Sequence, residues 1–446
     1  MMRTFTSTAV DTVILDDLSA RLHARAVELE HALSRALHSS FTSASLRHCF
    51  LRTAQCAHRV KDLAAKAGEG SRQYAQRELY LRGVTEEISS TLLWNLGRVM
   101  PALVAAYGPA IIGGVAIVLG LAAARRIAPG SAYDAFLTQF EKRLPDSGQV
   151  FSSPLLVTAT AHLVSGTDDF VAGVVGLPKP SRDGVFSGED AIATGVIAGL
   201  GLVGARTLQE TPVRVREVSQ FTAPAPQGYQ DVISRIPRAE DGAEQIRIER
   251  YDSGYVVYLG GTIDAGVEPG AEPWDMTSNM HSIAELDSGS YRAAVMAMKE
   301  AGISASDNVI LVGHSQGGLI AAQLAASGEY RVSDVVTVGA PLHHIEIPED
   351  VHVLSVEHSE DVIPSLSGVA APVAVATHLT VKRSLYSGTS APRDQVLPAH
   401  NLSRYIETGA VMDRSTDNKL VTQQHRLSQH MRGTATVTTF RGDRVQ

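Results

Sequence analysis

The sequence predicts an α/β fold, with a mostly parallel sheet covered by helices on both faces, preceded by a largely α-helical N-terminal domain. The C-terminal half alternates short β-branched runs with helical stretches, which is typical of a parallel sheet. Residues 12–93 instead carry Ala, Leu, Arg and Glu at helical spacing. Because 446 residues exceed one ordinary core, we expect at least two domains.

The overall composition is that of a globular protein, with 44% hydrophobic and 19% charged residues. A net charge of −8 argues against a nucleic-acid partner, because phosphate binding needs a basic face. Cys49 and Cys56 are predicted two turns apart on one helix, roughly 10 Å between Cα atoms. A disulfide needs less than about 7 Å, so we expect free thiols.

The N-terminal domain is predicted over 1–210, and it contains two apolar segments. Segment 99–124 has no charge and is long enough for a membrane span of about 20 residues. Pro101 and Pro109 interrupt it and its residues are small, so a buried helix pair is the alternative. Segment 191–205 is short for a span, but the two segments could pair as a hairpin through their glycines. Contact with a membrane through 99–124 is therefore one of two open interpretations.

The chain start lacks an apolar run of signal-peptide length and a small-residue cleavage site, so we expect no signal peptide. A membrane-associated or a cytoplasmic location follows. After the helical domain, a Pro-bearing polar stretch predicts a linker and lead-in over 211–243, and a second domain over 244–446.

The second domain reads as alternating strands and helices. The stretch "EQIRIERYDSGYVVYLGGT" predicts two strands around a turn at Asp252-Ser253-Gly254. Three later runs predict strands that each end in a polar or glycine-rich loop: "NVILVGH", "VSDVVTVGAP" and "DVHVLSVEHSEDVIP". Helices are predicted between them at "GSYRAAVMAMKEAG" and "GGLIAAQLAASG". The tail "GTATVTTFRGDRV" predicts an antiparallel edge strand.

Ser315 lies in the order Gly313-His314-Ser315-Gln316-Gly317, between a predicted strand and a predicted helix. This is the context of a nucleophile elbow, in which the residues two positions away must lack bulk. Gly313 and Gly317 meet that need. The helix N-terminus beside the serine favours developing negative charge. The alternative is an ordinary tight turn.

A nucleophilic serine needs a base to take its proton and an acid to orient the base. The expected chain order is serine, acid, histidine. Glu357, Glu360 and Asp361 are the candidate acids, and we favour Asp361 because it lies in the loop after its apolar run.

The candidate bases are the later histidines, which are His378, His400, His425 and His430. We favour His400, because a Pro-bearing loop that enters a helix can bring a base onto the serine. His378 lies in an alternating strand pattern, and His425 and His430 lie in a polar stretch. The histidines before the acid are interpreted differently. His343 and His344 are expected in a loop near the cleft, and His314 is expected either to pack in the core or to support the catalytic residues.

An oxyanion hole needs two donors. One is the backbone N–H of Gln316, the residue after the serine. The second is expected in the loop Gly260-Gly261-Thr262, where Thr262 adds a hydroxyl. The alternative is a plain glycine turn.

Together these residues resemble the α/β-hydrolase superfamily, and more narrowly actinobacterial lipase-like serine hydrolases. The resemblance covers about residues 244–445 and is carried in order by "LGGT", "EPWDMTSN", "LVGHSQGG", "VGAP", "HSEDVIP" and "HNLSRY". One departure is Gly260, where the family pattern has proline. The N-terminal half resembles helical regions of type VII secretion substrates, with "YAQRE" matching the Tyr-x-x-x-acid export pattern, so this non-classical export is an alternative.

The expected function is hydrolysis of lipid or other acyl esters by a Ser315–Asp361–His400 triad through an acyl-enzyme. Acyl transfer by the same triad is one alternative. A membrane-active or secreted toxin-like protein, whose helical half carries the main role, is the other. We expect no metal or organic cofactor, because no Cys/His cluster with ligand spacing occurs.

Overall fold

The computed structural model describes residues 208–445 with short gaps, and a few segments before them. The gaps are 265–268, 285, 343–344, 369–374, 376, 387–389, 393–394 and 396. The earlier described residues are 2–5, 20, 22–28, 31, 52–66, 69 and 152–165.

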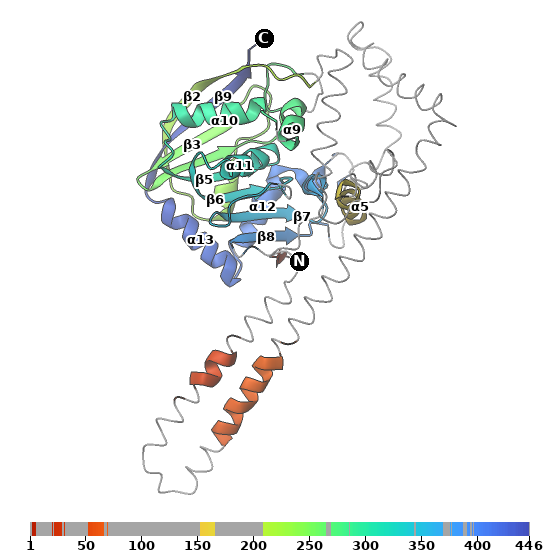
Figure 1. Cartoon of the computed structure of the whole chain (residues 1–446), viewed down its shortest axis with the longest axis vertical. Helices are drawn as coiled ribbons and strands as arrows, with labels where there is room; N and C mark the ends of the chain where they lie inside the picture. Colours follow the sequence, from red (N-terminus) through yellow and green to blue (C-terminus); the bar gives the residue numbers. More distant parts are fainter. Residues whose placement is uncertain are drawn as a thin grey trace, which may run out of the picture. The chain divides into compact units, whose positions relative to one another are not determined.

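The described strands form a single mixed sheet in the order β1-β8-β7-β6-β5-β4-β3-β9-β2, and all of them except β1 come from the second half of the chain or from just before it (Figure 1). Strands β4 to β8 pair in parallel, whereas β3 pairs antiparallel with β4 and β9, and β9 with β2. The bounds are β1 Met2–Phe5, β2 Val213–Pro224, β3 Ile246–Tyr251, β4 Gly254–Leu259, β5 Asn308–His314, β6 Arg331–Val338, β7 His352–His358, β8 His378–Arg383 and β9 Thr434–Arg444. The carboxyl ends of β4 to β8 therefore meet at one edge of the sheet, where ligands bind in open α/β folds.

Helices cover both faces of this sheet, as the sequence predicted. Their bounds are α8 Tyr229–Ser234, α9 Met276–Ile283, α10 Gly289–Glu300, α11 Gln316–Ala326, α12 Leu402–Met412 and α13 Asn418–His430. The 3₁₀ helices are η1 Pro364–Ser367 and η2 Pro398–His400. Figure 1 shows α10 and α11 lying over one face.

Successive side chains of a strand point to opposite faces of the sheet, so alternate residues pack into two separate cores. Ile310 and Val312 of β5 point into the core formed with α8, α12 and α13. Their neighbours Val309 and Leu311 point into the core formed with α10 and α11. A strand buried on both faces reads as a continuous apolar run, which is why "NVILV" does not alternate.

Two segments differ from the prediction. Residues 211–243, expected to be a linker and lead-in, form β2 and α8, and β2 pairs with β9 along its whole length. The tail strand β9 is antiparallel as predicted, but it lies between β3 and β2 rather than at the edge. Strand β2 could not be predicted from its sequence, because most of its side chains face solvent and it therefore lacks an apolar pattern.

The N-terminal half is described only in pieces. Residues 22–28 and 52–66 are helical and belong to the second of two compact units. Cys56 is a free, exposed thiol, and Cys49 lies outside the described residues. Helix α5 spans Pro154–Ser165. Segments 99–124 and 191–205 lie outside the described residues, and in the part that is described no helix is long and apolar enough to cross a membrane.

Candidate active site

The turn between β5 and α11 places Ser315 in a backbone conformation that side chains rarely adopt. Its φ is 52° and its ψ is −120°. A Cβ atom at Gly313 would lie 2.2 Å from the carbonyl oxygen of Gly317, and one at Gly317 would lie 2.2 Å from that of Leu259. Any larger residue would collide with backbone at both positions. The strained turn and its two glycines match the steric requirement of an elbow.

Three side chains from separate loops form one hydrogen-bonded row beside this turn. The Ser315 hydroxyl lies 2.9 Å from His400 Nε2, and His400 Nδ1 lies 2.7 Å from Asp361 Oδ2. Ser315 follows β5, Asp361 follows β7, and His400 ends η2 after β8. Because these parallel strands end at the same edge, residues 85 and 39 positions apart in sequence are brought together.

Asp361 is held as a charged acceptor. Its side chain is buried, and burial alone would raise its pKa. The charge and hydrogen bond of His400, with bonds from Tyr405 and the Ile363 N–H, outweigh burial and hold the Asp361 pKa below its ordinary value. The Tyr405 hydroxyl donates to Asp361 Oδ2 at 2.6 Å, and the Ile363 N–H to Oδ1 at 3.0 Å.

The other two candidate acids have different partners. Glu357, inside β7, pairs with Lys382 at 3.5 Å. Glu360 accepts bonds from the backbone N–H groups of Leu385 and Tyr386, and from the Ser384 hydroxyl. Glu360 therefore fastens the chain after β8 to the loop that carries Asp361. Of the three acids, Asp361 bonds His400.

The other three candidate bases, His378, His425 and His430, lie away from Ser315. His378 begins β8, at the end of the strand opposite to the carboxyl edge. His430 contacts Asn308 at the start of β5, and His425 contacts Gln429 on the same helix, α13. His343 and His344 lie outside the described residues.

Two buried histidines hold the backbone around His400. His314 bonds the His400 carbonyl oxygen at 2.9 Å, and His358 bonds the Ala399 carbonyl oxygen at 2.7 Å. Burial lowers the pKa of His314 to about 3 and that of His358 to about 4, so both are neutral donors at neutral pH. His358 also stacks on Tyr405, at 3.9 Å between ring centroids.

The sequence interpretation missed the role of His358 and of Tyr405. His358 ends β7 and Tyr405 lies in the first turn of α12, so their stacking appears only when β7 and α12 pack. The short spacing between His400 and Tyr405 was the available sequence signal, because it places Tyr405 in the first helical turn after the loop that carries His400, close enough to contact the same acid.

The predicted oxyanion loop lies against the elbow. A Cβ atom at Gly261 would lie 2.8 Å from His314 Nδ1 and 3.4 Å from Ser315 Cβ, so the loop backbone approaches the serine closely. The Thr262 hydroxyl oxygen accepts a bond from Asn279 Nδ2 at 2.9 Å, which leaves its proton free to donate elsewhere. Gln316 is the first residue of α11, where an N–H has no acceptor within the helix.

This arrangement is equipped for proton transfer and for stabilising negative charge. His400 can take the Ser315 proton while Asp361 stabilises the resulting imidazolium. Within the residues that the structure describes, no group of three or more His, Cys, Asp or Glu side chains could hold a metal ion.

Residues 304–413 match a family described as the alpha/beta hydrolase fold, and this range includes Ser315, Asp361 and His400. No curated protein and no solved structure matches the chain significantly. The match and the helix-covered, mostly parallel sheet agree, and they support a hydrolase of the α/β fold.

Proposed function

We propose that this protein hydrolyses carboxylic esters, with Ser315 as the nucleophile and an acyl-enzyme as the intermediate. The observation that carries the proposal is the continuous row of hydrogen bonds, 2.7 and 2.9 Å long, from Asp361 through His400 to the Ser315 hydroxyl. Such a row turns a weak nucleophile into a strong one at neutral pH.

Each residue then has one role. His400 Nε2 takes the proton as Ser315 Oγ attacks the ester carbonyl carbon. The Gln316 N–H and Thr262 donate to the oxyanion, an interaction whose loss costs about 10²–10³ in kcat per donor. The C–O bond to the alcohol breaks, and His400 returns the proton to that alcohol. Water, deprotonated by His400, then attacks the acyl-enzyme and releases the acid and free Ser315.

Apolar side chains near the carboxyl edge support an apolar acyl group. Ile345 and Ile347 are partly buried after β6, where they pack against the buried Ala340 and Leu342. Leu366 on η1 is 40% exposed, five residues after Asp361. A lipid or another long acyl ester would bury such surface, at about 25 cal/mol per Å². The resemblance to lipase-like serine hydrolases points the same way.

Hydrolysis of p-nitrophenyl butyrate by the intact chain and by Ser315→Ala tests the proposal. We expect the S315A rate to fall to background, since no other nucleophile replaces the hydroxyl. Equal rates for both chains would refute the esterase assignment. Assaying p-nitrophenyl palmitate in micelles tests the lipid preference, which fails if only the short soluble ester is cleaved. Product analysis with an added alcohol separates hydrolysis from acyl transfer.

A further inference from the structure

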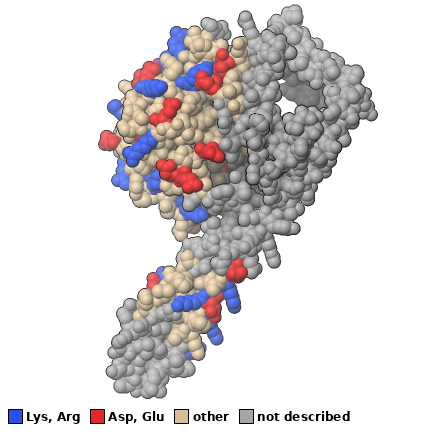
Figure 2. All heavy atoms as spheres, in the orientation of Figure 1, with Lys and Arg blue, Asp and Glu red and all other residues tan. Residues whose placement is uncertain are grey.

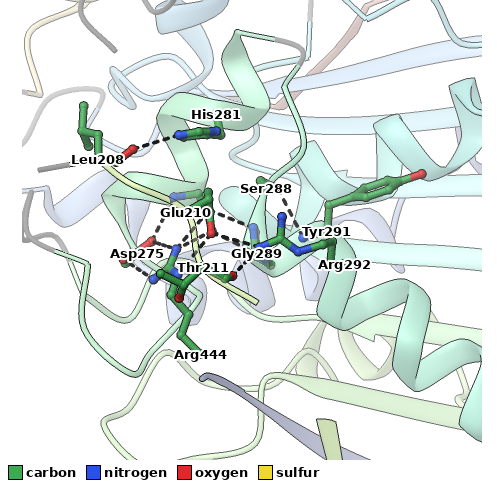
Figure 3. A network of polar contacts seen from close by, with 12 residues as sticks. Leu208, Glu210, Thr211, Asp275, His281, Ser288, Gly289, Tyr291, Arg292 and Arg444 are labelled. Carbon is green, nitrogen blue, oxygen red and sulfur yellow. Dashed lines mark hydrogen bonds and ion pairs between the residues drawn. The ribbon is translucent and has the colours of Figure 1, made fainter. Parts of the chain in front are cut away.

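A buried polar network lies beside the oxyanion loop, centred on the guanidinium of Arg444. Figure 3 shows Glu210 and Asp275 directed at this guanidinium. Arg444 bonds both Asp275 carboxylate oxygens, at 2.6 and 2.9 Å, and both Glu210 oxygens, at 3.0 and 3.2 Å. The Arg444 and Asp275 side chains are 1% and 0% exposed, and that of Glu210 is 8% exposed. This is a two-sided, charge-assisted clamp rather than a surface ion pair.

The three charged groups come from distant parts of the chain. Glu210 lies three residues before β2. Asp275 begins α9, and Arg444 ends β9. Arg292 of α10 adds a second positive charge to Glu210 at 3.3 Å, so two arginines balance two carboxylates. Such balance is what allows charges to be buried.

Asp275 connects the Arg444 network to the oxyanion loop. Its carboxylate caps α9 by accepting the Ser278 N–H at 2.9 Å. Its backbone forms a β-bridge with Asp264, and Trp274 beside it accepts the N–H groups of Ile263 and Asp264 at 2.8 and 3.1 Å. Moving Asp275 would therefore move the chain that directly follows Thr262.

Two further contacts reach the site itself. Asn279, one turn into the helix that Asp275 caps, donates to the Thr262 hydroxyl oxygen at 2.9 Å. The Gln316 side chain donates to the Asp275 carbonyl oxygen at 3.4 Å and to Ser290 Oγ at 3.1 Å. Both residues expected to donate to the oxyanion are thus tied to the element that Arg444 fixes.

We propose that Glu210 and Arg444 are positioning residues for the oxyanion hole, acting through Asp275 and α9. Glu210 also holds the start of α10, because it accepts the Gly289 N–H at 2.8 Å, and it binds α9 directly by accepting the Ser278 hydroxyl at 2.8 Å. The short segment before β2 is therefore part of the support of the site. This inference rests on the proposed function, since it assigns a role in stabilising the oxyanion.

The decisive variant is Glu210→Gln, which keeps the shape of the side chain and removes its charge. We expect kcat for p-nitrophenyl butyrate to fall about tenfold with KM within about twofold, because positioning acts in the transition state. A trifluoromethyl ketone, whose adduct with serine carries an oxyanion, should bind about tenfold more weakly in parallel. Asp287→Asn is the matched control: Asp287 is a 65% exposed partner of the same Arg292, and its loss should leave all three values unchanged.

Amide hydrogen exchange gives a readout that does not depend on activity. The Ile263 and Asp264 amides should exchange faster in E210Q than in the wild type, and at wild-type rates in D287N. If E210Q does not fold, Arg444→Lys keeps a charge without the two-sided fork and should show the same changes. The proposal is overturned if the variant loses stability while kcat, inhibitor affinity and exchange at 263–264 stay at wild-type values. S315A run in parallel reports on the proposed function alone, so the two failures are distinguishable.

Discussion

Replacing Tyr405 by Phe isolates one hydrogen bond to the buried acid. The Tyr405 hydroxyl donates to Asp361 Oδ2 at 2.6 Å, and both side chains are fully buried. A hydrogen bond to a charged group contributes about 1.5–3 kcal/mol, roughly twice a neutral one. The substitution removes a single oxygen and leaves the ring stacked on His358, so the packing cost is small. We expect the free energy of unfolding to fall by about 1.5–3 kcal/mol, and Tm to fall by about 3–12 °C.

The loss should depend on pH in a defined direction. Because the pKa of Asp361 is depressed in the folded protein, its charge contributes stability above its unfolded pKa of about 4. That stability is lost as the pH falls through the folded pKa. Tyr405→Phe removes one cause of the depression, so the difference between wild type and variant should be full at pH 7 and shrink below about pH 4.

Tyr229→Phe is the matched control for this experiment. The Tyr229 hydroxyl is also buried and donates at 2.7 Å, but to the neutral carbonyl oxygen of Leu420. Its loss should cost about 0.5–1.5 kcal/mol with no dependence on pH between 7 and 4. Urea unfolding of the three proteins measures both effects. Equal costs for Y405F and Y229F, or a Y405F cost that grows as the pH falls, would refute the reasoning.

Three further outcomes are expected. Gly317→Ala places a Cβ atom 2.2 Å from the Leu259 carbonyl oxygen, so we expect loss of ester hydrolysis and a stability loss of about 3 kcal/mol or more, measured by activity and urea unfolding. Thr262→Val should lower kcat about a hundredfold, while Thr262→Ser should keep most of it. Equal kcat values for T262V and T262S would show that the Thr262 hydroxyl does not donate to the oxyanion. Glu249→Gln should cost about 3–5 kcal/mol in urea unfolding, because the buried Glu249 carboxylate pairs with Arg235 at 2.8 Å; a loss below about 1 kcal/mol would contradict this.

Most of the sheet could be predicted because its strands have local signals. The β3–β4 hairpin, β5, β6 and β7 lie where β-branched runs end in turn residues, and "GHSQG" marks the elbow between β5 and α11. The elbow could be recognised from the sequence because only glycine fits at 313 and 317, where a Cβ atom would lie 2.2 Å from a backbone oxygen. Asp361 and His400 could be favoured because both lie in loops, in the chain order serine, acid, histidine.

The rest depends on contacts that no local pattern reports. Strand β2 is polar and gains its place from pairing with β9, more than 200 residues later. Helix α13 was read only as a polar stretch, although Leu420 and Leu427, two turns apart, are buried on one side. The Arg444 network joins residues up to 234 positions apart, so its members look like ordinary surface charges in the sequence.

The same network includes Glu210, which lies just before the Pro-bearing stretch that predicts the domain boundary and which bonds Arg444 of β9. Figure 2 shows acidic and basic side chains interspersed over the visible described surface, which explains why charge patterning alone gave no sign of a buried clamp.

The central claim is that Ser315 is a nucleophile activated by His400, and labelling with a fluorophosphonate tests it most directly. The reagent forms a covalent bond with an activated serine, and mass analysis of the digested protein identifies the modified residue. The intact chain should carry one label on Ser315, and Ser315→Ala should carry none. Equal labelling of the intact chain and S315A, or a label on another residue, would contradict the account.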